Sequence, residues 1–448
     1  MTRHDTHGIA LSTTRAEAVA AYDHALALFN RFRRDPLAVI GQALEQDPDF
    51  VAGHLLRAGL LLGSFDSLVV PMAGACLEAA AACGTQPNVR ERSLLGALRT
   101  WVMQGLDAGN RALDRHLVDH PRDLFALQLA HLGDLMLGRT LMLRDRMARM
   151  DGIWHAGEPG HAYVMAMQAF GLEENADLAQ AEALGLQALE LQPHNTWAVH
   201  AVAHVHETSG RSDQGLRWLE GTRPRWRSDN ILSVHLHWHL ALCRLACEGA
   251  ASALRLYDEA IAPTPESLAM NLSDATALLW RLHLRGVDGG ARWAALADRW
   301  LQRAAWGRTA FTDLHAALSL AMAGSDAVNR DFTAALEAAR FGRTAALPWD
   351  LVVRPAQQAF ADYVAGDHRA CADRLLGVLP VLQAVGGSHA QRELVLLTAA
   401  SAAERGGDLA LAQALERQRT ALRRLAGRAL RPDPWPVSSH ELPSAAFA

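Results

Sequence analysis

Histidines gather in one part of this chain, at spacings that suit metal binding or proton transfer. Seven of the 21 histidines lie between His194 and His239. Because a helix repeats about every 3.6 residues, side chains three or four positions apart share a face. One predicted face carries an indole, two imidazoles and a carboxylate: Trp197, His200, His204 and Glu207. His235 and His239 lie one turn apart on a second predicted helix.

These histidines can supply ligands to a divalent metal ion. Imidazole nitrogen is a good ligand for zinc and other borderline metals, and two pairs with a carboxylate give three or four donors. The possible metal ligands are His200, His204, His235 and His239. Glu207 would then orient a histidine or act as a general base. The HExxH pattern of metalloproteases is absent, because Glu207 directly follows His206 and no histidine follows at the required spacing.

A structural role for the histidines is the alternative. Histidines are often half-buried, and here they can hydrogen-bond across a helix interface beside Trp197 and Trp238. His206 and His237 point away from the two faces and fit this alternative best. Satisfying many buried imidazoles needs a dedicated network, which favours a site for the cluster as a whole. The positions of five histidine side chains distinguish the two roles: His161, His200, His204, His235 and His315. Their convergence on one cavity would favour a binding site, and their dispersal through the core would favour a packing role.

A repeat in the sequence predicts the elements that carry these residues. Helical hairpins of about 34 residues often end with a small residue, a larger apolar one, another small one and a proline that stops the second helix. Four stretches follow this order: Pro36, Ile40, Ala43 and Pro48; Gly109, Leu113, His116 and Pro121; Ala181, Gly185, Ala188 and Pro193; Ala253, Tyr257, Ala260 and Pro265. Their last prolines are 73, 72 and 72 residues apart, so a further, more divergent hairpin fits into each interval.

We therefore expect an all-α fold, a tetratricopeptide-like α-solenoid of stacked helical hairpins that winds into a right-handed superhelix. The composition agrees, because hydrophobic residues make up 50% of the chain and alanine and leucine dominate. The predicted solenoid is a single domain over residues 1–430, with the best repeat matches at 15–265, divergent hairpins at 266–430 and an irregular tail at 431–448. Its first helices would line a concave groove and carry the two histidine pairs.

Composition also excludes several classes of partner. The net charge of -5 and the pI near 6.5 leave no basic surface for nucleic acid. No run of about eighteen apolar residues predicts a membrane span. The five cysteines show no CxxC or disulfide-framework spacing. The first residues lack the apolar segment of a secretory signal, so a cytoplasmic location is expected.

Long motifs around the histidines resemble a known family. They are Gly160–Glu174, Trp197–Glu207 and Leu236–Leu242, followed by Leu256–Asp258, Phe311–His315 and Gly386–Arg392. On these motifs the chain resembles the tetratricopeptide repeat protein 38 family, which has members in bacteria and animals, and it looks like a bacterial member. The resemblance spans nearly the whole chain. It implies a helical-repeat fold and no settled biochemical activity.

The groove supplies the candidate functional residues. Those expected to bind a ligand are His161, Glu174, Trp197, His200, His204, His235, His239, His315, His389 and Arg392. The candidates for a catalytic role are Glu207, His204 and His315. Ser388 follows a glycine pair and is predicted to cap a helix. Arg392 would hold either a substrate carboxylate or a neighbouring glutamate.

Two functions remain in view. In the first, a histidine-rich concave pocket binds a small molecule or a divalent metal such as zinc, and whether it also catalyses a reaction stays open. In the second, the chain is an interaction scaffold whose groove takes a peptide or a partner helix. The histidines, tryptophans and glutamate favour the first, because a peptide groove more commonly presents lysine, arginine and asparagine. A homodimer is compatible with either.

Overall fold

The computed structural model describes residues 3–303, 306–307, 309–340 and 348–425, and these are almost entirely helical. The predicted all-α class is therefore confirmed. Near the N-terminus two short strands, β1 (Arg3–His4) and β2 (Ala10–Leu11), pair in antiparallel fashion. The irregular tail predicted at 431–448 lies outside the described residues.

The helices follow one another with short connections. In the first half they are α1 (Ala16–Asn30), α2 (Pro36–Gln46), α3 (Val51–Leu62), α4 (Val70–Ala82), α5 (Val89–Gln104), α6 (Leu106–Asp119), α7 (Leu124–Met136), α8 (Thr140–Ala148), α9 (His161–Glu173), α10 (Leu178–Leu191) and α11 (Thr196–Thr208). In the second half they are α12 (Ser212–Thr222), α13 (Ser233–Cys247), α14 (Ala250–Leu256), α15 (Ala269–Leu284), α16 (Ala291–Gln302), α17 (Ala310–Ala323), α18 (Asp326–Arg340), α19 (Arg354–Val364), α20 (His368–Val378), α21 (His389–Arg405) and α22 (Leu409–Leu425). Short helical turns are η1 (Ser67–Val69), η2 (Arg223–Arg225), η3 (Tyr257–Ile261), η4 (Trp349–Val353) and η5 (Leu379–Val385).

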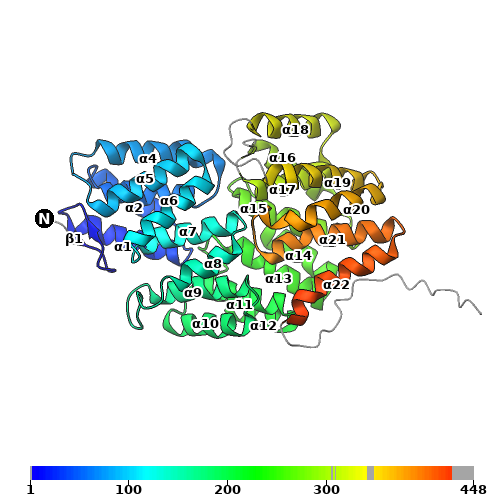
Figure 1. The fold of residues 1–448 in the computed structure, drawn as a ribbon, viewed down its shortest axis with the longest axis horizontal. Coiled ribbons are helices and arrows are strands. Elements are labelled where there is room, and N and C mark those ends of the chain that lie inside the picture. Colours follow the sequence, from blue (N-terminus) through cyan, green and yellow to red (C-terminus); the bar gives the residue numbers. More distant parts are fainter. Residues whose placement is uncertain (1–2, 304–305, 308, 341–347, 426–448) are drawn as a thin grey trace, which may run out of the picture.

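Neighbouring helices pack against each other as hairpins. The closest pairs include α3 with α4, α5 with α6, α9 with α10 and α19 with α20. The four repeat stretches fall on second helices, namely α2, α6, α10 and the α14–η3 segment. Each interval between them holds a further hairpin, as the proline spacing predicts: α3 and α4, α7 and α8, α11 and α12. Figure 1 shows α1 to α6 at one end of the molecule and α16 to α20 at the other.

Small residues allow the second helices to approach the first ones closely. A Cβ atom on Gly109 of α6 would lie 2.3 Å from Cβ of Trp101 on α5. A Cβ on Gly185 of α10 would lie 2.8 Å from Cγ2 of Val202 on α11. Real Cβ atoms do not come this close, so glycine is required at both positions. The repeat pattern thus reports on helix contact rather than on composition alone.

Polar caps set where the site-bearing helices begin. The side chain of Asn195 accepts from the backbone N–H of Ala198 and starts α11, and its amide donates to Ala162 O of α9 at 2.9 Å. Ser388 caps α21 in a capping box with Gln391, as predicted. The sequence Ser12-Thr13-Thr14 before Arg15 predicts a helix cap, and this prediction is wrong. Helix α1 begins at Ala16, and Thr13 instead accepts from the backbone of Arg15 in the preceding turn.

The C-terminal helices return to the middle of the chain. Helix α21 contacts both α11 and α15, and Figure 1 shows it beside the central helices. Gln383 of η5 donates to Gly138 O at 2.9 Å, and the backbone N–H of His389 donates to Oε1 of Glu174 at 2.8 Å. These contacts join residues more than two hundred positions apart, so the C-terminal helices pack back onto the middle of the chain, with α21 against α11.

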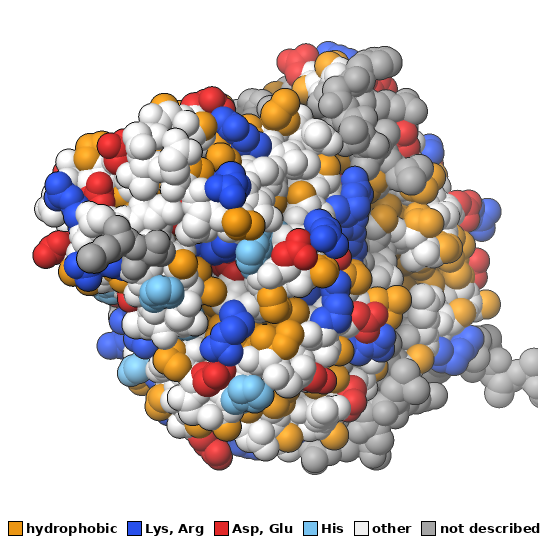
Figure 2. Space-filling model, turned by 60° about the vertical axis from the view of Figure 1, so that its left-hand side comes forward, with side chains coloured by type: hydrophobic (Ala, Val, Ile, Leu, Met, Phe, Trp, Pro, Cys, Tyr) orange, Lys and Arg blue, Asp and Glu red, His pale blue; other side chains and the backbone are white. Residues whose placement is uncertain are grey.

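The outer surface is mixed in character. On the described part of the face in Figure 2, basic, acidic and hydrophobic side chains alternate, and histidines are scattered. This agrees with the net charge of -5. Among the described residues, no helix combines the length and the hydropathy needed to cross a bilayer.

Candidate metal centre

Four histidines converge between two successive first helices of the array. His200 and His204 come from α11, and His235 and His239 come from α13. Nε2 of His200 lies 3.0 Å from Nε2 of His235 and 3.0 Å from Nε2 of His204. Nε2 of His239 lies 3.2 Å from Nε2 of His235. The four rings therefore present one nitrogen each to a shared point, a grouping that could hold a metal ion.

Carboxylates lie behind three of the four rings. Nδ1 of His235 faces both oxygens of Asp274 on α15, at 3.0 and 3.1 Å. Nδ1 of His239 lies 2.8 Å from Oε2 of Glu207. Nδ1 of His204 lies 3.6 Å from Oε2 of Glu173, the last residue of α9. A carboxylate on the far nitrogen of a histidine is the usual outer partner of a metal ligand.

These partners decide which ring nitrogens carry hydrogen. A carboxylate accepts only, so the rings of His235 and His239 carry a hydrogen on Nδ1, and in a neutral ring this leaves a lone pair at Nε2. The two lone pairs then face each other across 3.2 Å. Two neutral rings in this state have no hydrogen to share at that contact. A cation between them would turn the repulsion into attraction.

The cluster lies inside the protein. His200, His204 and His239 are buried, and the side chain of His235 is 13% exposed. Burial lowers the pKa of His200, His204 and His239 well below the ordinary histidine value, and the neighbouring imidazoles lower it further. The rings of these three histidines are therefore neutral at pH 7, which is the form that binds metals.

Aromatic rings enclose the cluster on one side. Trp197 packs on His200 with ring centres 4.6 Å apart and stacks on Phe32 at 5.3 Å. Its indole N–H donates to Nε2 of His131 at 3.2 Å. Trp238 stacks on His235 at 5.5 Å. These contacts fix the ring orientations, and Trp197 lies beside the histidines, as its place on their helix face predicts.

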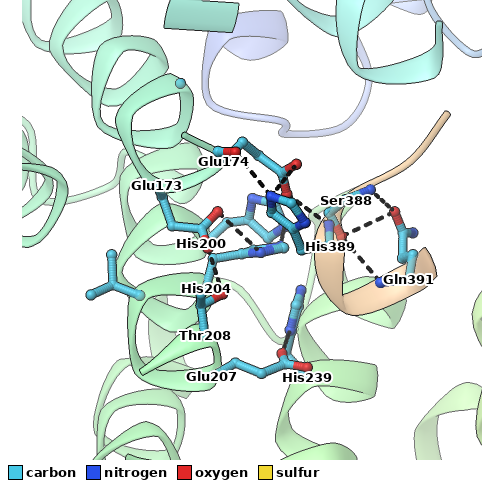
Figure 3. Close-up of polar contacts among 12 residues, drawn as sticks. Glu173, Glu174, His200, His204, Glu207, Thr208, His239, Ser388, His389 and Gln391 are labelled. Atoms are coloured by element: carbon cyan, nitrogen blue, oxygen red, sulfur yellow. Dashed lines mark hydrogen bonds and ion pairs between the residues drawn. The ribbon is translucent and has the colours of Figure 1, made fainter. Parts of the chain in front are cut away.

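Glu174, His389 and Arg392 form a second polar group next to the first. Oε1 of Glu174 accepts from the backbone N–H of His389 at 2.8 Å, and Oε2 accepts from Nη2 of Arg392 at 3.1 Å. Figure 3 shows His389 reaching from α21 toward Glu174, with Glu173 and His204 beside them. Of the two roles considered for Arg392, the structure has the bond to a neighbouring glutamate.

His161 and His315 are not among the four histidines that converge. His161 begins α9 and Glu173 ends it, and twelve residues of helix separate them by about 18 Å. His315 on α17 donates from Nδ1 to Phe311 O of its own helix at 2.8 Å. Of the five histidines whose convergence was expected for a binding site, three come together: His200, His204 and His235. His239 completes the cluster.

The histidines expected to face away do so. His206 packs against Trp218, with ring centres 6.3 Å apart. His237 bonds through Nδ1 to Ser233 O at 2.8 Å and packs against Trp226. Both are buried among the second helices, so they serve as natural controls for the inward-facing set.

Sequence reasoning missed Glu173, Asp274 and His131. Glu173 directly precedes the predicted Glu174, in a stretch that carries the family resemblance. The prediction for Glu174 could therefore have drawn attention to Glu173. Asp274 lies 35 residues beyond His239 on another helix, and no local pattern marks it. His131 lies on α7, far earlier in the chain.

A cavity of about 250 Å³ adjoins the cluster. Glu207 lines it, together with residues of η5, α21 and α22. Glu207 is the catalytic candidate that both borders this cavity and bonds to a histidine of the cluster. No model of a known protein family matches the chain.

Proposed function

We propose that this chain is a helical-repeat protein that binds one divalent transition-metal ion through Nε2 of four histidines: His200, His204, His235 and His239. The observation that carries the proposal is the convergence of the four Nε2 atoms, in which Nε2 of His235 and His239 lie 3.2 Å apart with carboxylates behind both rings. A bound cation explains that arrangement, and hydrogen bonding between neutral rings does not.

The spacing of the nitrogens supports this coordination. Zinc–imidazole bonds of about 2.0–2.1 Å in a tetrahedron place neighbouring nitrogens about 3.3 Å apart. The separations of 3.0, 3.0 and 3.2 Å are close to that value. An all-imidazole set suits zinc, copper or nickel, and we propose zinc as the metal to test first.

A site with four protein ligands leaves no open position, which is typical of a structural metal. We therefore propose that the metal first of all locks α11 to α13. A catalytic role would need one ligand to leave, and His235 is the most exposed of the four. Glu207 would then be the residue placed between the metal and the adjoining cavity.

The proposal extends to the fold and its relatives. The stacked hairpins support a tetratricopeptide-like solenoid with a right-handed superhelix, and the motifs around the histidines support a place in the tetratricopeptide repeat protein 38 family. A cytoplasmic location and a homodimeric state stay predictions. The scaffold alternative also stays, although α21 lies over α11 and leaves less room there for a partner peptide.

Metal analysis of the purified protein tests the proposal. The chain should bind close to one zinc ion after loading and dialysis, and His200→Ala and His239→Ala should lose it. His206→Ala and His237→Ala, on the same two helices but facing away, are the matched controls and should keep it. Cobalt substitution should give the visible absorption of tetrahedral cobalt.

Two results would overturn the proposal. One is a wild-type protein that retains no metal after loading with zinc, copper or nickel. The other is equal metal content in the inward-facing and outward-facing variants. A partner recovered by pull-down and lost on mutation of groove residues would instead support the scaffold.

A further inference from the structure

Two adjoining cavities lie between the histidine helix α11 and the C-terminal helices. The larger has a volume of about 250 Å³ and the smaller about 60 Å³. Both are lined by Glu207 of α11, Glu393 of α21 and Arg419 of α22. The larger is below the roughly 300–1,000 Å³ of pockets that hold drug-sized ligands, so it suits a smaller molecule.

The smaller cavity contains a buried cation with a vacant donor. Arg281 of α15 lines this cavity and is 4% exposed. Its Nη2 donates to Ala390 O at 2.6 Å and lies 3.8 Å from Oε2 of Glu393. Its Nη1 is buried without a hydrogen-bond partner among the described residues. A buried donor left unpaired is costly, so an acceptor is expected beside it.

Other arginines around the cavities are already engaged. Arg419 bonds to Glu416 at 2.8 Å and to Glu393 at 3.2 Å. Arg285 donates to Leu245 O at 3.2 Å, and Arg392 is held by Glu174 at 3.1 Å. Arg281 differs from them, because its guanidinium lies over the ring of Trp238 at 5.6 Å and its Nη1 has no hydrogen-bond partner among the described residues.

The charge around Arg281 favours an anion as that ligand. Three guanidinium groups line the smaller cavity, on Arg281, Arg285 and Arg419. Two carboxylates line it, on Glu207 and Glu393. The guanidinium fork matches the geometry of a planar carboxylate.

The larger cavity has a different lining. Leu379 and Leu382 of η5, together with Ala390 and Leu396 of α21, supply much of its wall. An apolar chain would leave water by entering there. The two cavities together thus offer a polar end and an apolar end.

We propose that these cavities bind a small organic monocarboxylate, with the carboxylate at Arg281 and the apolar part against Leu379 and Leu382. This site goes beyond metal binding and does not rest on it, because none of its polar contacts involves the four histidines. It adjoins them through Glu207, which bonds to His239, and through Trp238, which lies under Arg281 and stacks on His235.

Calorimetric titration of the full chain, stripped of metal with a chelator, tests the proposal. Hexanoate should bind with one-to-one stoichiometry, and affinity should rise about fourfold per added methylene from acetate through butyrate to hexanoate. Hexan-1-ol and hexylamine should bind at least tenfold more weakly than hexanoate, since neither satisfies a cation. Inorganic phosphate should show no gain from an apolar chain and should bind weakly.

Arg281→Gln should weaken hexanoate binding at least tenfold, and Leu382→Trp should do the same by filling the larger cavity while leaving Arg281 in place. Arg299→Gln, at a half-buried position on α16 where the side chain bonds to Gln302, is the matched control. Circular dichroism melts establish which variants fold. If Arg281→Gln fails to fold, Leu382→Trp decides.

The proposal is overturned if hexanoate does not bind to the wild type, or if it binds a folded Arg281→Gln or Leu382→Trp variant as tightly. Equal binding of hexylamine also overturns it. Phosphate binding as tight as hexanoate would show a site for inorganic anions instead. Repeating the titration on zinc-loaded protein separates this result from the fate of the metal proposal.

Discussion

Replacing Asp274 by asparagine is the sharpest perturbation of the metal centre. Asp274 is 2% exposed, and both of its oxygens lie about 3 Å from Nδ1 of His235. Asparagine has nearly the same shape and keeps one acceptor, so the ring keeps its orientation. What changes is the negative charge that makes the imidazole a stronger ligand.

The expected loss in metal affinity is ten- to a hundredfold, which corresponds to about 1.4–2.7 kcal/mol. The metal-free protein should respond differently. Removing a buried carboxylate charge costs little there and can raise the free energy of unfolding. The variant should therefore be as stable as the wild type without metal and gain less stability when zinc is added.

The assay has two parts. Competition with a chromophoric chelator gives the zinc dissociation constant, and urea unfolding with and without zinc gives the two free energies. Asp213→Asn is the matched control, because Asp213 lies at an exposed i,i+4 pair with Arg217 on α12. Unchanged zinc affinity in Asp274→Asn, with stability lost in the metal-free protein, would refute the reasoning and make the histidines a packing network.

Three further predictions follow from the same structure. Removing metal with a chelator should lower the free energy of unfolding of the wild type by about 2.7 kcal/mol, relative to protein in free zinc at a hundredfold excess over the dissociation constant. The stability of His239→Ala should not change, and an equal change in both proteins would contradict the site. Burial lowers the pKa of His315 to about 4, below its unfolded value of 6.5, so the stability present above pH 6.5 should fall by up to about 3 kcal/mol as pH drops toward 4. His315→Leu should make the stability of chelator-treated protein depend less on pH, and an unchanged dependence would assign the acid sensitivity to other groups. Gly109→Ala should lower the free energy of unfolding by about 1–3 kcal/mol, because its Cβ would lie 2.3 Å from Cβ of Trp101. Gly96→Ala, with open space around it, should leave that free energy unchanged or raise it by up to about 1 kcal/mol. Thermal melts that show equal stability for the two variants would contradict the close approach of α5 and α6.

Much of the architecture was accessible from local patterns. The small residues and prolines of the repeat mark helix contacts and helix ends, so they predicted the hairpins and the intervening units. Ser388 was recognisable as a cap from its place after two glycines. The start of α1 was not, because Thr13 uses its hydroxyl within the turn before the helix rather than at its end.

The inward and outward histidines were also separable in advance. His200 and His204 share a face because of helix periodicity, and His206 is turned away by the same rule. That rule acts within one helix. It places a side chain on a face without saying how far the facing helix lies, so His161 and His315 were grouped with the cluster although they are not among the four histidines that converge.

The sequence by itself therefore determined the helical class, the hairpin period and the faces on which the histidines stand, since these depend on residues a few positions apart. Only the tertiary structure decided that four Nε2 atoms meet within about 3 Å of their neighbours. It also placed Asp274 behind His235 and Arg281 beside the cavity, and it laid α21 over α11. These features depend on how distant helices pack, and the distance between two helices is set by the side chains of both.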